Sequence, residues 1–333
     1  MLRTIVLTIE FSAGDVARMR FALSCLWEVA SAYHVLQGPE GHTVLHPWVR
    51  HVRPALDRAG LTPRGDSLLA GLIPPGPTYA PDFLTPPPTS LVPDLDRELT
   101  VLRATPHETV RKEIDLLHWG RTPAVEAMHD DPATGLERLA GEIGTLWDIA
   151  IAPYWQRMRA LLEAEVFHRA RLLAEQGAEG LLNSIHERVN WHENTLSVAK
   201  WCAGATTLSA NGLLLVPTVF VWPAVRTVPS PVDPQLAYPP RGVATLWETA
   251  AKAPAALAAV IGKGRAQLLV ELDAPASTSE LAKRTGMTAG GVSQHLRVLR
   301  EAGLITPHRL GHSVLNVRTA AADTLLAATA SAA

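Results

Sequence analysis

The amino-acid sequence predicts an α+β fold that is mainly helical. Apolar residues recur at helical spacing through much of the N-terminal part, whereas residues 3–11, 195–200 and 213–222 have the pattern of strands. Near the C-terminus, two short helices with clear start signals precede two further strand patterns. We therefore expect a mixed α/β domain followed by a small helix-turn-helix domain that carries a β-hairpin.

Composition places the chain among globular proteins. Hydrophobic residues make up 47% of its 333 residues and charged residues 19%, which is typical of a protein with a sizeable core. The longest apolar run, 212–225, is shorter than the ~20 residues that cross a bilayer, and it contains two prolines. The N-terminus lacks the apolar centre of a secretory signal, and Cys25 and Cys202 are too few for a disulfide framework. We expect a cytoplasmic protein with no membrane partner.

The first elements follow from local patterns. Residues 3–11 alternate between apolar and other side chains, as a half-buried strand does. Asp15 is placed to cap a helix over residues 15–36, in which apolar residues recur at helical spacing. The prolines concentrated over residues 74–93 predict a loop or lid without a regular hydrogen-bond ladder.

The middle of the chain changes from helices to strands. Thr105 and Glu108 form the capping-box pattern of a helix start, and helical spacing dominates from there to about Glu187. The strands at 195–200 and 213–222 follow. This order predicts a mixed α/β domain for the N-terminal part of the chain.

A proline-punctuated segment predicts the domain boundary. The expected parts are an N-terminal domain (1–228), a proline-rich linker (229–242) and a C-terminal domain (243–333). From Thr245 onward there are nine Lys and Arg against six Asp and Glu, in a chain whose net charge is −2. The positive excess therefore accompanies the C-terminal domain, as contact with a polyanion requires.

Residues 277–305 carry the start signals of two short helices. Ser277 and Glu280 form a capping box that opens the first helix, and Gly286 ends it. Thr288 is placed to cap the second helix. Its apolar residues recur at i, i+4 and i+7 and form one stripe, which consists of Val292, Leu296 and Leu299.

The face of the second helix opposite this stripe is polar. Its side chains can bond to phosphates and to base edges; they are Ser293, Gln294, Arg297 and Arg300. Gly290 and Gly291 each cost the helix ~1 kcal/mol relative to Ala. They either permit close approach to DNA or are merely tolerated near the helix start. We expect His295 to contact neighbouring groups rather than to bind a metal.

A β-hairpin and a last helix complete the pattern. Residues 304–318 predict a strand, a turn at Gly311 and a second strand, and the Ala-rich residues 319–333 predict a helix. This order is that of a winged helix-turn-helix. The predicted DNA-binding residues of the second helix and its cap are Thr288, Ala289, Gly290, Ser293, Gln294 and Arg297.

The segment TSELAKRTGMTAGGVSQHLRVLREAGLI, with RLGHSVLNVR after it, resembles the winged helix of ArsR/SmtB-type bacterial transcriptional regulators. The resemblance covers residues 257–318. It implies that Ser293 and Gln294 face bases and that Arg309 lies near the DNA backbone or minor groove. The predicted DNA-binding residues of the wing are therefore Arg309 and His312. The long N-terminal part, with YPPRGVATLWE, resembles the extension of a longer subgroup of these regulators.

The chain departs from the metal-sensing members of that family. Those members carry a C-x-C pair on the first helix of the helix-turn-helix, where this chain reads SELAKRT, or metal ligands on the C-terminal helix, where it offers Asp323 alone. His312 and Asn316 also stand where basic and aromatic residues are commoner in the wing. We expect no metal site, and a metal-responsive repressor is the alternative.

The segment HERVNWHE, residues 186–193, comes nearest to a catalytic motif. A zincin needs two histidines in the spacing H-E-x-x-H, but the fifth residue here is Asn190. His186 and His192 would lie almost opposite each other on a helix, so we expect a polar helix end, no catalytic residues and no cofactor. The remaining alternative is an enzyme with a DNA-binding appendage, which a metal or cofactor at these histidines would reveal.

All nine tryptophans lie at or before Trp247. They either fill a large core or line a mostly apolar ligand pocket. Because a winged helix alone can bind DNA, the long N-terminal domain needs a separate purpose. We expect a homodimeric transcriptional repressor that binds double-stranded operator DNA and whose DNA affinity changes when an apolar small molecule binds the N-terminal domain. The sequence does not predict which residues bind this effector.

Overall fold

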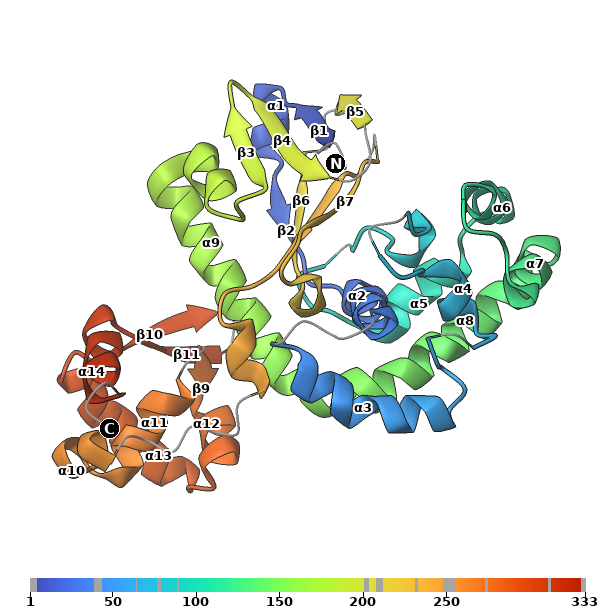
Figure 1. Ribbon diagram of the computed structural model, residues 1–333. Helices are drawn as coiled ribbons and strands as arrows, with labels where there is room; N and C mark the ends of the chain where they lie inside the picture. The colour runs from blue at the N-terminus through green and yellow to red at the C-terminus, as the bar shows by residue number, and fades with distance from the viewer. Residues whose placement is uncertain are drawn as a thin grey trace. The chain divides into compact units, whose positions relative to one another are not determined.

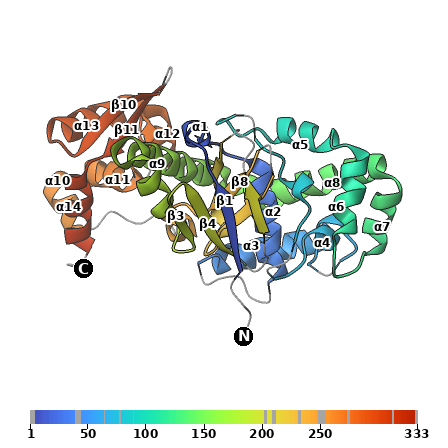
Figure 2. The same cartoon turned by 90° about the horizontal axis from the view of Figure 1, so that it is seen from above.

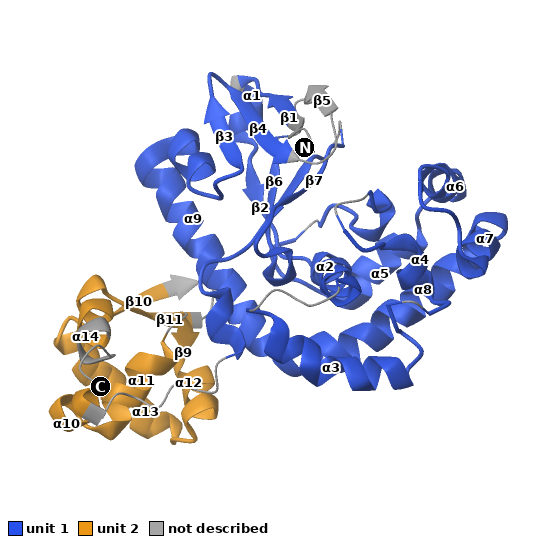
Figure 3. Cartoon of the chain, viewed as in Figure 1, with its two compact units in different colours: residues 1–247 blue, residues 248–333 orange. Residues whose placement is uncertain are grey.

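The structure is a computed structural model. It describes residues 5–38, 44–63, 65–76, 79–88, 90–200, 204–207, 212–230, 233–247, 255–272, 275–310 and 313–330. The chain divides into two compact units, residues 1–247 (unit 1) and 248–333 (unit 2), which Figure 3 shows in blue and orange. Helices predominate and strands form small sheets, so the predicted mainly helical α+β class is confirmed.

Most of unit 1 is helical (Figure 1). Its helices are α1 (Ala13–Ala17), α2 (Cys25–Gln37), α3 (His46–Arg58), α4 (Leu68–Leu72), α5 (Leu95–Arg103), α6 (His107–Asp115), α7 (Pro123–Asp130), α8 (Pro132–Leu146) and α9 (Trp155–Asn183). Its shorter helical turns are η1 (Asp82–Leu84), η2 (Trp147–Ile151), η3 (Ala152–Tyr154), η4 (Val219–Val221) and η5 (Val243–Trp247).

The first predicted helix is two helices with a strand between them. Ser12 caps α1: its hydroxyl accepts from Asp15 N at 3.2 Å, and Asp15 Oδ2 accepts from Ser12 N at 2.8 Å. After α1 comes a short strand, and Ser24 then caps α2 by accepting from Trp27 N at 3.1 Å. The prediction that Asp15 caps one long helix is therefore wrong, because two serines supply separate helix starts.

Unit 1 contains two small mixed sheets. The first has the order β3 (Val189–His192), β4 (Thr195–Lys200), β1 (Ile5–Glu10) and β5 (Gly204–Thr207). The second has the order β2 (Arg20–Phe21), β6 (Leu214–Pro217), β8 (Gln235–Tyr238) and β7 (Arg226–Val228). Of the strand predicted over 213–222, only β6 forms, and η4 follows it.

Strand β8 lies inside residues 229–242, the segment predicted as a linker. All of its residues are buried, and it pairs parallel with β6 and antiparallel with β7. This segment is therefore part of the sheet of unit 1, and the two units divide after Trp247.

The long helix α9 packs against β3, and both views place it beside β3 and β4 (Figures 1 and 2). It is kinked at Gly177, whose φ of 68° and ψ of −170° only glycine adopts readily. Beyond the kink, Leu181 and Leu182 are buried against the sheet residues Val189 and Trp191. The segment 186–193 is thus a turn followed by β3, and the prediction of a helix end there is wrong.

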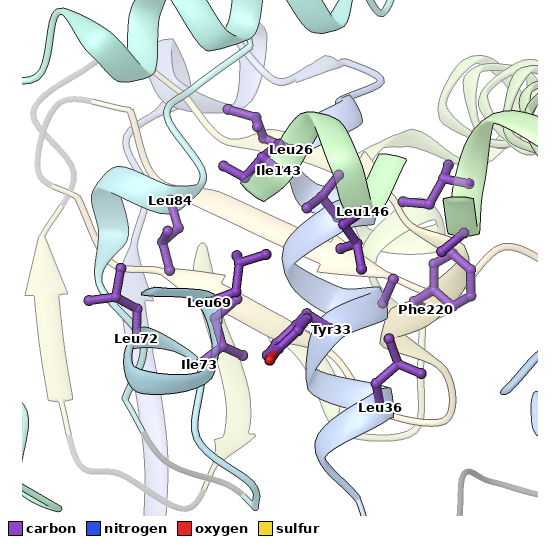
Figure 4. Packing of buried hydrophobic residues seen from close by; sticks show 14 of the residues in the cluster. Leu26, Tyr33, Leu36, Leu69, Leu72, Ile73, Leu84, Ile143, Leu146 and Phe220 are labelled. Atoms are coloured by element: carbon purple, nitrogen blue, oxygen red, sulfur yellow. The ribbon is translucent and has the colours of Figure 1, made fainter. Parts of the chain in front are cut away.

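The interior of the helical part is closely filled. Figure 4 shows buried side chains of α2, α4 and α8 pointing toward one another, among them Leu26, Leu69 and Ile143. The space between these side chains leaves no room for a water molecule. The proline-rich segment 74–93 joins this core through Phe83 and Leu84 of η1, which are both buried, so it is an anchored loop.

Several tryptophans pack in or against this core. The ring centroid of Trp48 lies 4.3 Å from that of Phe220, and that of Trp247 lies 5.4 Å from that of Tyr154. Trp48 Nε1 also donates to Ala150 O at 2.8 Å. These residues support the simpler of the two interpretations of the tryptophan excess, a large core.

Unit 2 has the predicted order of helices and strands. Its elements are α10 (Ala255–Ile261), α11 (Lys263–Glu271), β9 (Ala276–Ser277), α12 (Thr278–Thr285), α13 (Ala289–Glu301), β10 (Ile305–Leu310), β11 (Ser313–Arg318) and α14 (Ala320–Ala330). The strands form a sheet of order β10, β11, β9, and the unit has its own apolar core. The predicted winged helix-turn-helix is confirmed, although its turn at Gly311 lies outside the described residues.

None of the described helices combines the length and the apolar character that crossing a membrane requires.

Candidate nucleic-acid interface

The two helices of the helix-turn-helix start and stop where the sequence predicts. Ser277 caps α12: its hydroxyl accepts from Glu280 N at 3.3 Å, and Glu280 Oε2 accepts from Ser277 N at 2.7 Å. Gly286 ends α12 in the left-handed region, with φ 70°. Thr288 then caps α13, because its hydroxyl accepts from Gly291 N at 3.2 Å. The turn between the helices is therefore short and well defined.

Helix α13 has one buried and one exposed face. The predicted stripe is buried, and it consists of Val292, Leu296 and Leu299. Ser293, Gln294 and Arg297 are exposed. Among the described residues none of these three side chains has a hydrogen-bond or ion-pair partner. They can therefore bond to an external partner without first losing an internal contact.

The first turn of α13 is also open. Thr288, Ala289 and Gly290 are exposed, and a Cβ added at Gly290 would meet no described atom within 4 Å. Packing inside unit 2 therefore does not require glycine at this position. The case of Gly264 in α11 is different, because a Cβ there would lie 2.8 Å from His295 Nε2. His295 thus packs against α11, as predicted.

Two polar residues near this face have partners inside unit 2. Asn316, which stands in the wing where basic and aromatic residues are commoner in the family, is 1% exposed, and its Nδ2 donates to Ala276 O at 3.3 Å. Arg300, assigned to the polar face of α13, donates from Nη2 to Asn316 Oδ1 at 3.4 Å. The pair joins α13 to the wing sheet, so its contacts are internal to unit 2.

The wing is described in part. Arg309 lies in β10, opposite Val314 of β11. His312 lies outside the described residues. The structure thus places six of the eight predicted DNA-binding residues on α13 and its cap, and a seventh on β10.

Among the other basic residues of unit 2, some form internal hydrogen bonds or ion pairs and some are exposed. Arg284 Nη1 donates to Glu271 O at 3.2 Å, and Arg318 forms an ion pair with Asp323 at 3.0 Å. Lys283 is exposed and has no partner among the described residues. Arg297 and Lys283 are therefore available to phosphates, one on each helix of the helix-turn-helix.

Neither a metal site nor a catalytic site at His186 and His192 is assembled in the described part of the chain. No group of three or more His, Cys, Asp and Glu residues there is placed to hold a metal ion. His186 Nε2 lies 2.9 Å from Pro223 O, and His192 is exposed at the end of β3, where its Nε2 lies 3.8 Å from Glu193 Oε1. These histidines each have a separate local partner.

Two family models match the chain. A helix-turn-helix domain matches residues 263–308, which run from α11 into β10. A family of unknown function, DUF5937, matches residues 121–242, which run from α7 past β8. No curated protein and no solved structure matches. The helix-turn-helix domain indicates a DNA-binding transcriptional regulator rather than an enzyme.

Proposed function

We propose that this protein is a one-component transcriptional repressor of the ArsR type, which binds operator DNA through unit 2 and an effector through unit 1. The observation that carries this proposal is the exposed, unpartnered face of α13. It presents Ser293, Gln294 and Arg297 beside an open first turn, opposite a stripe that is fully used in the core. A recognition helix needs this division between packing and reading faces.

The side chains of this face suit both kinds of DNA contact. Gln294 can donate to and accept from an adenine edge, and Ser293 can bond to several bases. Arg297, together with Arg309 and His312 of the wing, is assigned to phosphates or the minor groove. Thr288, Ala289 and Gly290 form the end of the helix that approaches the groove. The sequence preference would then come mainly from Gln294.

The repressor acts as a homodimer, because two recognition helices must enter successive major grooves about one helical turn apart. The strongest candidate for the dimer surface is α10 with α14. Val260 of α10 is 78% exposed, the most exposed large apolar side chain among the described residues, and α10 packs against α14. Burial of this surface in a second copy would remove apolar area from water.

Unit 1 is assigned to binding the effector. The protein acts in the cytoplasm, where the operator DNA is. An effector changes DNA affinity only by as much as its own affinity differs between the two dimer geometries, typically by ~1–3 kcal/mol. A dimer that occupies a promoter blocks transcription, and effector binding releases it. A metal-responsive repressor is the second candidate, but no observation in the described residues favours it.

The test is selection of DNA by the full-length protein from a pool of random duplexes. The proposal predicts enrichment of an inverted repeat whose half-sites are about one helical turn, or a multiple of it, apart. Size-exclusion chromatography with light scattering should give the mass of a dimer. No enrichment beyond the salt-dependent binding of any duplex would contradict the proposal.

A further inference from the structure

Unit 1 contains a cavity of about 370 Å³ beside α9 and the segment that follows β8. Small-molecule sites commonly have ~300–1,000 Å³. The apolar residues of its lining include Val44, Ile185, Trp222, Pro239, Pro240 and Val243. Its polar lining residues are Arg169, Ser184 and Arg241, and no acidic residue among those that the structure describes lines it.

The two arginines share a single carboxylate. Glu165 Oε1 accepts from Arg169 Nε at 2.5 Å, and Glu165 Oε2 accepts from Arg241 Nε at 3.1 Å. The side chains of Glu165 and Arg169 are 1% and 3% exposed, whereas that of Arg241 is 58% exposed. Burial, and next the Arg241 guanidinium, lower the pKa of His168 from 6.5, so this neighbouring imidazole adds no charge at neutral pH. The group therefore carries one surplus positive charge.

Arg169 is held in place by hydrogen bonds and still has N–H donors without an acceptor among the described residues. Its Nη1 donates to Ser184 O at 2.9 Å and to Ser184 Oγ at 2.7 Å, and its guanidinium lies 5.7 Å from the ring centroid of Tyr238. Among the described residues, Nη2 of Arg169 and both Nη atoms of Arg241 have no acceptor. Guanidinium donors fixed in this way form strong, charge-assisted hydrogen bonds with a carboxylate.

We propose that this cavity binds an organic monoanion with an apolar body, its carboxylate on Arg169 and Arg241 and its body against Trp222 and the prolines. One surplus charge matches one carboxylate, whereas a phosphate monoester would bring about two negative charges. This inference rests on the proposed function, because it gives the chemical class of the effector assigned to unit 1. It also refines the expected effector, which must be apolar only in part.

Two residues of the cavity lining lie shortly before unit 2 in the sequence. Val243 and Ala244 line the cavity and begin η5, which ends at Trp247, the last residue of unit 1. Trp247 packs against Tyr154, and its Nε1 is buried with no hydrogen-bond partner in the part of the chain that the structure describes. A bound anion would therefore contact the start of η5, the last element of unit 1 before unit 2 in the sequence.

The first experiment measures binding to the full-length protein without DNA. The probes are benzoate, phenylacetate, 2-naphthoate and octanoate, each compared with its neutral primary amide by tryptophan fluorescence and calorimetry. At least one carboxylate should bind about tenfold or more tightly than its amide, since a hydrogen bond to a charged group contributes ~1.5–3 kcal/mol. Equal binding of every acid and amide, or no binding of any acid at millimolar concentration, would overturn the proposal. Acetate and inorganic phosphate, which lack an apolar body, should bind more weakly than the best acid.

The second experiment tests whether the arginines of the cavity cause the preference for a carboxylate over its amide. Arg241→Gln should abolish the preference for acid over amide, and Arg241→Lys, which keeps the charge, should retain part of it. The matched control is Arg171→Gln, because Arg171 lies on α9 as Arg169 does, is 69% exposed and pairs with Glu175 away from the cavity lining. Loss of the preference in the control variant, or its full retention in Arg241→Gln, would contradict the site. If Arg241→Gln does not fold, the comparison of acid and amide binding to the unaltered protein and to Arg241→Lys still tests the proposed site.

These measurements separate the two proposals. If the protein selects operator DNA but shows no preference for carboxylates, the regulator stands and this effector class is wrong. If it prefers carboxylates but selects no DNA, the cavity stands and the regulator is wrong.

Discussion

Arg300 of α13 donates to Asn316 of the wing at 3.4 Å, and Asn316 in turn donates to Ala276 of β9 at 3.3 Å. Asn316 is thereby the point at which α13, β11 and β9 are joined by side-chain hydrogen bonds. This polar residue of the wing is therefore buried and holds the strands and α13 together.

Asn316→Ala should destabilise unit 2 by ~1–3 kcal/mol, because it leaves the Ala276 carbonyl and Arg300 without this partner. All tryptophans lie in unit 1, so hydrogen exchange of α13 and β11 is the suitable measurement. Ser293→Ala is the control, since its exposed side chain has no internal partner. Unchanged exchange protection, with DNA affinity alone reduced, would show that Asn316 contacts DNA.

Gly290→Ala should stabilise α13 by up to ~1 kcal/mol, because Ala favours helix and the added Cβ meets open space. It should nevertheless weaken operator binding by about tenfold or more, if the bare backbone is what approaches the base edges. Gel-shift titration with the selected operator measures the second effect. Retained affinity would mean that the glycine is only tolerated at the helix start.

The buried carboxyl of Glu28 predicts a pH dependence of unit 1. Both of its oxygens lie within 3.1 Å of Val219 N, and burial raises its pKa from 4.5 to about 8. Between these values the folded protein binds a proton that the unfolded chain does not, so stability falls as the pH rises, by at most about 1.4 kcal/mol per pH unit for one group.

Urea unfolding followed by tryptophan fluorescence at pH 6 and pH 8 tests this dependence. Glu28→Gln should be less sensitive to pH than the unaltered protein, because an amide does not titrate. Burial also raises the pKa of Glu98 and Glu113, so the difference between the two proteins, rather than the slope of either, isolates Glu28. Identical pH slopes would contradict the assignment.

Operator binding should not depend on zinc. The described residues contain no group of three or more potential metal ligands, and transition metals require such a set. Affinity should therefore be the same with added zinc, without it and after chelation. A reversible tenfold effect of zinc would instead support the metal-responsive alternative.

The parts of the fold that the sequence predicts well are those governed by short-range rules. The caps at Ser277 and Thr288 and the stripe of α13 depend on residues within one or two helical turns, and the structure confirms them. Local patterns also mislead in unit 1, where Ser12 and Ser24 start separate helices and the prolines around β8 conceal a buried strand.

Contacts between residues far apart in the sequence cannot be predicted from local patterns. The ion pairs of Arg169 and Arg241 with Glu165 depend on how α9 meets the segment after β8, and no spacing rule relates these positions. The same holds for Arg300 and Asn316, whose polarity alone suggests a role at the surface.

The most direct test of the account is the effect of Gln294→Ala on specific and on non-specific DNA. Binding of the full-length protein to the selected operator and to an unrelated duplex of equal length should be measured at one salt concentration. Gln267→Ala is the matched control, because Gln267 is also exposed and has no partner among the described residues, but lies on α11. We predict a loss of ~1–3 kcal/mol on the operator alone for Gln294→Ala and no loss for the control. Equal losses on both duplexes would show that Gln294 does not read the sequence, and α13 would not be the recognition helix proposed here.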